Sequence, residues 1–134
     1  MKHILATLLL CFSISVSAEE LTHRQLIGNL LNSTVKIATF TDDGRAAGSG
    51  VIMHASGLIL TNYHVVHNTN RLKVWLYENR DRQYHEATVI GIDPAADLAL
   101  LDIDVREDDF FTVSDFEYES NTVYAGTDVI AVGH

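Results

Sequence analysis

The sequence predicts an all-β protein, an antiparallel barrel or sandwich preceded by one short helix. Two observations support this fold class. From residue 34 onward, short runs of β-branched and aromatic residues alternate with turn-forming residues, which is a pattern of strands. The segments that separate these runs are short, so successive strands are expected to pair as antiparallel neighbours.

The first expected element is a helix between Leu21 and Asn32. Four apolar residues in this segment recur at the spacing of one helical face. They are Leu26, Ile27, Leu30 and Leu31. The helical spacing is lost after Asn32, so we expect the helix to lead directly into the strands.

Seven strands are expected after the helix. Their bounds are Thr34 to Phe40, Ala47 to His54, Leu58 to Asn62, Leu72 to Glu78, His85 to Ile92, Leu98 to Ile103 and Asp128 to Val132. Three intervening sequences, residues 41–44, 55–57 and 78–82, are rich in Asp, Asn, Ser and Gly, as is typical of the turns of hairpins. Pro94 is the only proline, and we expect it in the loop before the sixth strand.

An acidic segment runs from Glu107 to Tyr124 and shows little periodicity. Its spacing lacks the alternating oxygen ligands and the glycine of a calcium-binding loop. A solvated surface loop is therefore expected there.

Residues 1–18 are predicted to be a secretory signal peptide. A short basic start is followed by an apolar run from Ile4 to Val16, and Ala18 ends a small-residue cleavage site. The run is shorter than the roughly 20 residues that span a bilayer, so we do not expect a membrane anchor. The mature chain would be periplasmic or secreted. It would have no disulfide, because Cys11 is the only cysteine.

Composition limits the partners of the mature chain. With 47% hydrophobic residues the chain can form a packed core, and its formal net charge is −9. An acidic surface repels phosphate groups, which argues against nucleic acids and anionic membranes as general partners.

His64 and Asp97 are the candidates for chemistry. His64 follows an apolar strand where the sequence turns polar, so its imidazole is expected to emerge at a strand end. An imidazole there can act as a general base. Asp97 lies 33 residues later, where a polar loop meets an apolar strand, and its carboxylate could be aimed at the imidazole.

Other roles for these residues are also open. A histidine after a strand is often a surface or hydrogen-bonded structural residue, and an aspartate before a strand is often a cap. His64, His67 and His85 could also bind a metal. The sequence gives little support to zinc, because it offers no cysteine ligand in the mature chain and no clear pattern of residues that would hydrogen-bond to the ligands.

Three ordered motifs carry a family resemblance. They are GSGVIMHASGLILTNYHVV at residues 48–66, VIGIDPAADLALLDID at residues 89–104 and DVIAVGH at residues 128–134. Together they closely resemble the HtrA, or DegP-like, branch of the trypsin-like serine proteases. In that family the first motif contains the catalytic histidine and the second contains the catalytic aspartate.

The resemblance implies a fold and a function. Residues 19–134 would be the first of two antiparallel β-barrels of a chymotrypsin-like protease domain, with the second barrel absent. His64 would be the general base and Asp97 would orient it in a serine endopeptidase that cleaves polypeptides. Neither a cofactor nor a metal is implied. A homo-oligomer, such as the trimer usual in the family, is consistent with the resemblance.

The nucleophile of the family is missing from this sequence. No Gly-x-Ser-Gly-Gly motif occurs, and the serines after Asp97 are Ser114 and Ser120, neither of which has neighbouring glycines. We therefore expect a fragment of a longer enzyme or the product of a truncated reading frame, inactive by itself. The alternative is a non-catalytic exported binding module. Substrate specificity and the presence of PDZ domains are left open.

Overall fold

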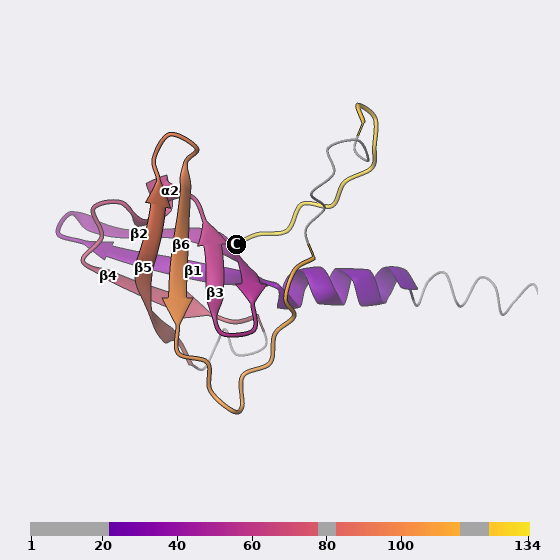
Figure 1. The fold of residues 1–134 in the computed structure, drawn as a ribbon, viewed down its shortest axis with the longest axis horizontal. Helices are drawn as coiled ribbons and strands as arrows, with labels where there is room; N and C mark the ends of the chain where they lie inside the picture. The colour runs from indigo at the N-terminus through magenta and orange to yellow at the C-terminus, as the bar shows by residue number, and fades with distance from the viewer. Residues whose placement is uncertain (1–21, 78–82, 116–123) are drawn as a thin grey trace, which may run out of the picture.

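The computed structural model describes residues 22–77, 83–115 and 124–134. In these ranges a helix at residues 22–32 is followed by six strands that form a closed antiparallel barrel (Figure 1). The strands are β1 Thr34–Thr41, β2 Gly44–His54, β3 Leu58–Thr61, β4 Arg71–Trp75, β5 His85–Asp93 and β6 Leu98–Ile103, with the short helix α2 Tyr63–Val66 after β3. The predicted all-β fold class is confirmed, and of the two predicted architectures the barrel is the correct one.

The barrel closes because β1 pairs with two strands. It pairs with β2 through the turn at residues 42–43 and with β4 on its other edge, giving the ring order β1-β2-β3-β6-β5-β4. Sequence neighbours supply most of these pairs. The contact between β3 and β6 joins strands that are far apart in the sequence, and it brings the end of β3 next to the start of β6.

Side chains along the strands alternate between the interior and the outside of the barrel, and the inward ones fill it. In β1, Val35, Ile37 and Thr39 are buried while Lys36 is exposed, as expected for a strand with one face toward a core. The fully buried side chains of the core come from several strands. The largest are Ile37, Ile52, Ile59, Leu76, Leu101, Val35 and Val74. A packed apolar interior of this kind supplies the main stabilisation of a chain without disulfides.

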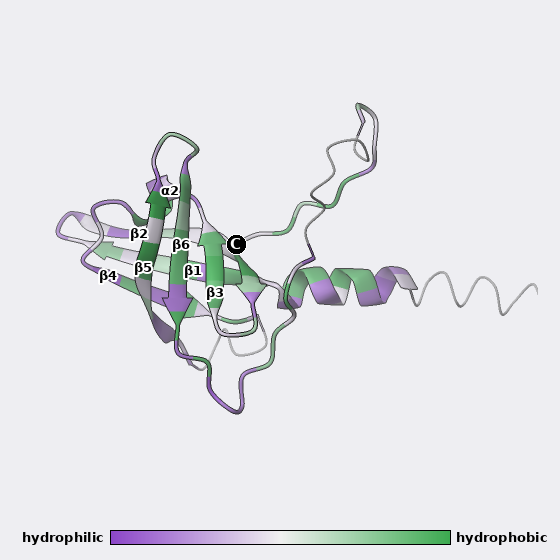
Figure 2. Ribbon diagram, in the orientation of Figure 1, coloured by the Kyte–Doolittle hydropathy of each residue, from purple (hydrophilic) through white to green (hydrophobic). Residues whose placement is uncertain are grey.

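The N-terminal helix is followed by the turn residue Ser33 and by Thr34, the first residue of β1, and both side chains cap its backbone. The hydroxyl groups of Ser33 and Thr34 both donate to the carbonyl of Leu30, at 3.0 and 2.8 Å. These bonds satisfy a carbonyl that the helix itself leaves without a partner. The helix projects from the end of the barrel (Figure 1). It carries both hydrophilic and hydrophobic residues (Figure 2), and Leu26 on its predicted apolar face is 48% exposed.

The β2–β3 turn depends on a glycine. Gly57 has a φ of +99°, and a Cβ added there would lie 2.3 Å from the carbonyl oxygen of Ile103. The backbone of Ile103 donates to the carbonyl of Gly57 at 3.2 Å. Both the conformation and the close approach of β6 exclude a side chain at this position.

One strand expected from the sequence is absent from the structure. Residues 128–132 do not form a strand: Val129 is 81% exposed, and β1 to β6 already pair in a ring that offers no open edge. The described part of the acidic segment, residues 107–115, is a loop as expected, but it is not fully solvated. Phe111 and Val113 pack against the core, and the N–H of Ser114 donates to the carbonyl of Ile52 at 3.0 Å.

Some predictions lie outside the described residues. They are the signal peptide at residues 1–18, the start of the N-terminal helix at Leu21, the turn at residues 78–82, the end of the fourth predicted strand at Glu78, and Ser120. The helix at residues 22–32 and α2 are the helices of the described ranges, and neither has the length and apolarity needed to cross a membrane.

Candidate active site

The sequence predicted His64 at the end of a strand. In the structure it lies instead on a single helical turn, α2. Strand β3 ends at Thr61, and α2 begins two residues later at Tyr63. The side chain of Asn62 does not cap this helix. Instead, the N–H of Tyr63 donates to the carbonyl of Asp97 at 3.2 Å. The first turn of α2 is thus tied to the loop that precedes β6, at the same end of the barrel (Figure 1).

The structure brings His64 and Asp97 together. Nδ1 of His64 lies 2.7 Å from Oδ2 of Asp97, and the backbone N–H of His64 donates to Oδ1 at 2.9 Å. One carboxylate therefore holds both the ring and the backbone of the same histidine. No described residue hydrogen-bonds to Nε2. The His64 side chain is 66% exposed and that of Asp97 is 44% exposed, so Nε2 is open to a reactant.

The loop before β6 holds Asp97 in an unusual conformation. Its φ is +55°, a left-handed region that L-residues enter at some cost and that is enriched at functional sites. The turn is stabilised by Asp93, whose Oδ1 accepts from the N–H groups of Ala95 and Ala96, both at 3.1 Å. Asp93 therefore shapes the turn that presents Asp97.

Hydrogen bonds keep the Asp97 carboxyl ionised. The pKa of Asp97 is lowered, first by the bond from the backbone N–H of His64 and then by the bond from its side chain, while desolvation opposes the change. The side chain of Asn62 contributes a further bond to Oδ2 at 3.2 Å and also donates to the backbone carbonyl of Asp97 at 3.1 Å. Asn62 is therefore part of the site. Its role was not predicted, although it lies within the motif that contains His64.

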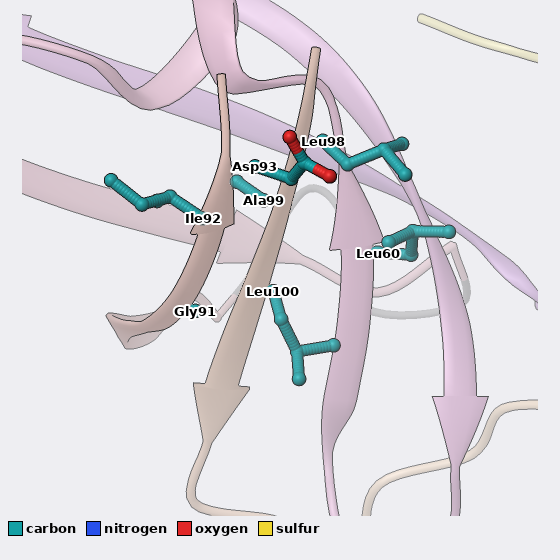
Figure 3. A pocket seen from close by; sticks show the side chains of 7 residues that line it. All are labelled: Leu60, Gly91, Ile92, Asp93, Leu98, Ala99 and Leu100. Carbon is teal, nitrogen blue, oxygen red and sulfur yellow. The ribbon is translucent and has the colours of Figure 1, made fainter. Parts of the chain in front are cut away.

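One hollow adjoins His64, and a second lies over strands next to the Asp97 loop. A cavity of about 360 Å³ lies between the β1–β2 hairpin and α2, and it is lined by Thr41, Asp42, His64 and His67 among others. A second hollow, of about 170 Å³, lies over β3, β5 and β6 and is lined by Leu60, Ile92, Leu98 and Leu100 among others (Figure 3). In Figure 2 the strands beneath this second hollow are strongly hydrophobic.

The three histidines considered for a metal are not arranged as one site. Nδ1 of His67 lies 3.0 Å from the carbonyl oxygen of His64. His85 is 3% exposed, and its two ring nitrogens contact the carbonyl of Asp104 and the carboxylate of Asp109. Within the described ranges no cluster of three or more His, Cys, Asp or Glu side chains could hold a metal ion.

The structural role of Asp109, which pairs with His85, was not predicted from the sequence. Sequence reasoning placed it in a solvated acidic loop, yet its side chain is 2% exposed and pairs with His85. Its second oxygen accepts from the N–H of Arg106 at 2.7 Å. Nothing in the local sequence distinguishes Asp109 from its acidic neighbours, because its partner lies 24 residues earlier.

Comparisons with known proteins show the family to which the chain belongs. The family model for the trypsin-like peptidase domain matches residues 48–134. A probable periplasmic serine endoprotease, DegP-like, from Rickettsia conorii is 41% identical over 88 residues, covering 65% of this chain and 16% of the relative. The serine endoprotease DegS of Haemophilus influenzae is 32% identical over 110 residues, covering 79% of this chain and 30% of the relative.

A solved structure shows the same fold. The crystal structure of the serine endoprotease from Yersinia pestis matches with a TM-score of 0.58 and 31% identity, covering 67% of this chain and 31% of that chain. The fold is that of the trypsin-like peptidase domain. The chain belongs to that family, and its similarity lies with the HtrA-type members. It spans less than a third of the length of these relatives.

Proposed function

We propose that His64 and Asp97 are the general base and its orienting carboxylate in an exported serine endopeptidase of the HtrA type. One observation carries the proposal. Asp97 engages Nδ1 of His64 at 2.7 Å, while Nε2 has no hydrogen-bond partner among the described residues. The proposal is supported by the family to which the chain belongs.

The chemistry follows from the hydrogen bonds. An ionised Asp97 can only accept at Nδ1, so that nitrogen carries the ring proton and Nε2 is left as a base. Nε2 would take the proton of a serine hydroxyl as its oxygen attacks a peptide carbonyl. It would then give the proton to the leaving amine, and water would release the acyl group by the same route. Asp97 would stabilise the imidazolium that forms between these steps.

The nucleophile would have to lie outside these 134 residues, because the sequence has no Gly-x-Ser-Gly-Gly motif. We propose that residues 19–134 form the first barrel of a two-barrel protease domain that cleaves polypeptides. Residues 1–18 would be a signal peptide that directs the protein to the periplasm. Curated relatives are named periplasmic serine endoproteases, which supports export.

The test begins with the gene. The coding sequence downstream of His134 is expected to contain an in-frame Gly-x-Ser-Gly-Gly segment, and the corresponding protein is expected to hydrolyse an unfolded polypeptide. Replacement of Asp97 by Asn should lower kcat by about 10⁴-fold, because the wrong histidine tautomer is then held. His64→Ala should lower kcat at least as much.

His54→Ala is the matched control. His54 is also an exposed histidine, but its Nδ1 contacts Ser56 in the β2–β3 turn, so its loss should leave kcat close to that of the unmodified protein. Near-normal activity of His64→Ala would refute the assignment of the base. The 134-residue chain alone should not cleave the substrate, and turnover that is lost on His64→Ala in this chain would contradict the need for an outside serine.

A further inference from the structure

Gly48 lies on β2 where α2 packs against the barrel. A Cβ added to Gly48 would lie 2.8 Å from both Cγ1 and Cγ2 of Val65. Carbon atoms in contact normally lie about 3.5–4.0 Å apart, so a methyl group does not fit. The φ of Gly48 is not in the left-handed region. The obstacle to a side chain at this position is therefore the space occupied by Val65, and not the backbone conformation.

Val65 cannot relieve this contact by changing its rotamer. Its two γ-carbons fill two of the three staggered positions around χ1, and both face Gly48. Any other staggered rotamer keeps at least one of these positions filled. Valine is also stiff at χ1 in a helix, and Val65 packs against the core of the barrel. A methyl group at residue 48 would therefore move the backbone of α2.

A displacement of α2 acts directly on the candidate site, because His64 immediately precedes Val65. The two bonds to Asp97 are 2.9 and 2.7 Å long, and hydrogen bonds weaken steeply when the donor and acceptor separate beyond about 3.2–3.5 Å. Relief of the 2.8 Å contacts to about 3.5 Å requires a movement of about 0.7 Å. A movement of that size away from Asp97 would lengthen the two bonds to about 3.6 and 3.4 Å, beyond the usual range of about 2.7–3.2 Å.

We propose that Gly48 is a positioning residue that sets how closely α2 seats on β2 and so maintains the His64–Asp97 hydrogen bonds. The importance of this role for catalysis rests on the function proposed above. The His64–Asp97 hydrogen bonds are measured without any proteolysis. The positioning role of Gly48 and the proposed protease function can therefore fail separately.

The test uses NMR spectroscopy of the 134-residue chain. The Nδ1–H resonance of His64 and the pH titration of the Asp97 carboxyl carbon report the hydrogen bonds. In Gly48→Ala the His64 resonance should be lost to exchange, and the pKa of Asp97 should rise toward its ordinary value, since the bonds from His64 are the largest causes of its lowering. Unchanged signals in Gly48→Ala would overturn the proposal.

A second variant tests the mechanism by rescue. Val65→Ala removes both γ-carbons, so the double variant Gly48→Ala, Val65→Ala should recover the His64 resonance and the low pKa of Asp97. Rescue should occur even where Gly48→Ala alone fails to fold. Failure of the double variant to restore these signals would show that the contact with Val65 is not the cause.

Gly50→Ala is the matched control. Gly50 lies on the same face of β2, but a Cβ there would meet Cγ2 of Ile59 at 2.7 Å, with no atom of α2 among its nearest neighbours. This variant should destabilise the barrel and leave the His64 and Asp97 signals of the folded protein unchanged. The same loss of signals in Gly50→Ala would mean that general disturbance of the barrel, and not the seating of α2, is responsible.

Discussion

The part of the chain that the structure describes contains two His–Asp pairs, which differ in exposure and in the number of ring nitrogens that are bonded. In the pair at the candidate site, His64 and Asp97 are 66% and 44% exposed and only Nδ1 of the ring is bonded. In the second pair, His85 and Asp109 are 3% and 2% exposed. There Nδ1 faces the carbonyl of Asp104 and Nε2 faces Asp109, at 2.9 and 3.1 Å.

A nearby carboxylate does not by itself make a histidine a base, since both histidines have one. A carbonyl oxygen can only accept, so Nδ1 of His85 must donate its proton to Asp104. A hydrogen bond at Nε2 then needs a second proton, held by either the ring or the carboxyl of Asp109. Both nitrogens are occupied and buried. His85 fastens the loop at residues 104–109 to β5, whereas His64 keeps one nitrogen available to a reactant.

The largest expected effect on the folded chain is the loss of the buried pair. His85→Ala should lower the free energy of unfolding by about 3–5 kcal/mol, because it leaves the Asp109 carboxylate buried without its partner. His64→Ala should change it by no more than about 0.5 kcal/mol, as is usual for an exposed side chain. Urea unfolding of the two variants measures this difference. Equal losses in both would remove the structural distinction between the pairs.

A smaller effect is expected in chemical reactivity. His64 should react with diethyl pyrocarbonate faster than His85, by at least roughly tenfold, since a buried group reacts only after local opening and each 1.4 kcal/mol of opening free energy slows it tenfold. Peptide mapping by mass spectrometry after brief treatment gives the rates. Exposed His54 serves as the reference, and modification of His85 at the rate of His54 would contradict its burial.

The smallest expected effect concerns the response of the exposed pair to pH. Because the pKa of Asp97 is lowered in the folded chain, its stabilising contribution is complete above the pKa of an unfolded aspartate. It is lost as the pH falls through the lower, folded value. A carboxyl-carbon NMR titration should follow this loss.

The variant His64→Ala sharpens the pH experiment. It removes the side-chain bond to Asp97 but keeps the backbone N–H of residue 64, whose bond is the largest cause of the lowered pKa. The pKa of Asp97 should therefore rise only part of the way to its ordinary value. A complete return would show that the imidazole, and not the backbone, holds the carboxylate.

The strands of the barrel could be predicted because each one is indicated by residues within the strand itself. The bounds expected for β6, Leu98 to Ile103, agree with the structure, and those of β1 and β5 differ by one residue. Alternating burial and β-branched residues produce such patterns within a few residues. The expected strand at residues 128–132 carries the same apolar pattern, but a strand also needs an edge to pair with, and the pattern contains no information about edges.

The candidate site was predictable in its residues and not in its geometry. The motif around His64 and the motif around Asp97 indicated which residues to examine. The helical turn of α2 was missed, because four residues are too few for a helical period to be recognised. The role proposed for Gly48 could not be predicted either, since Val65, the residue that it faces, lies 65 − 48 = 17 positions later in the sequence.

The sequence by itself determined the fold class, the N-terminal helix, six of the strands and the two residues of the candidate site, because each is encoded by a local pattern or a motif. Only the tertiary structure decided that the strands close into a barrel, that Asp97 reaches Nδ1 of His64 while Asp109 reaches His85, and which histidine keeps a nitrogen free. These outcomes depend on contacts between residues 24 or more positions apart. Such contacts are set by strand pairing and core packing, which no short stretch of sequence specifies.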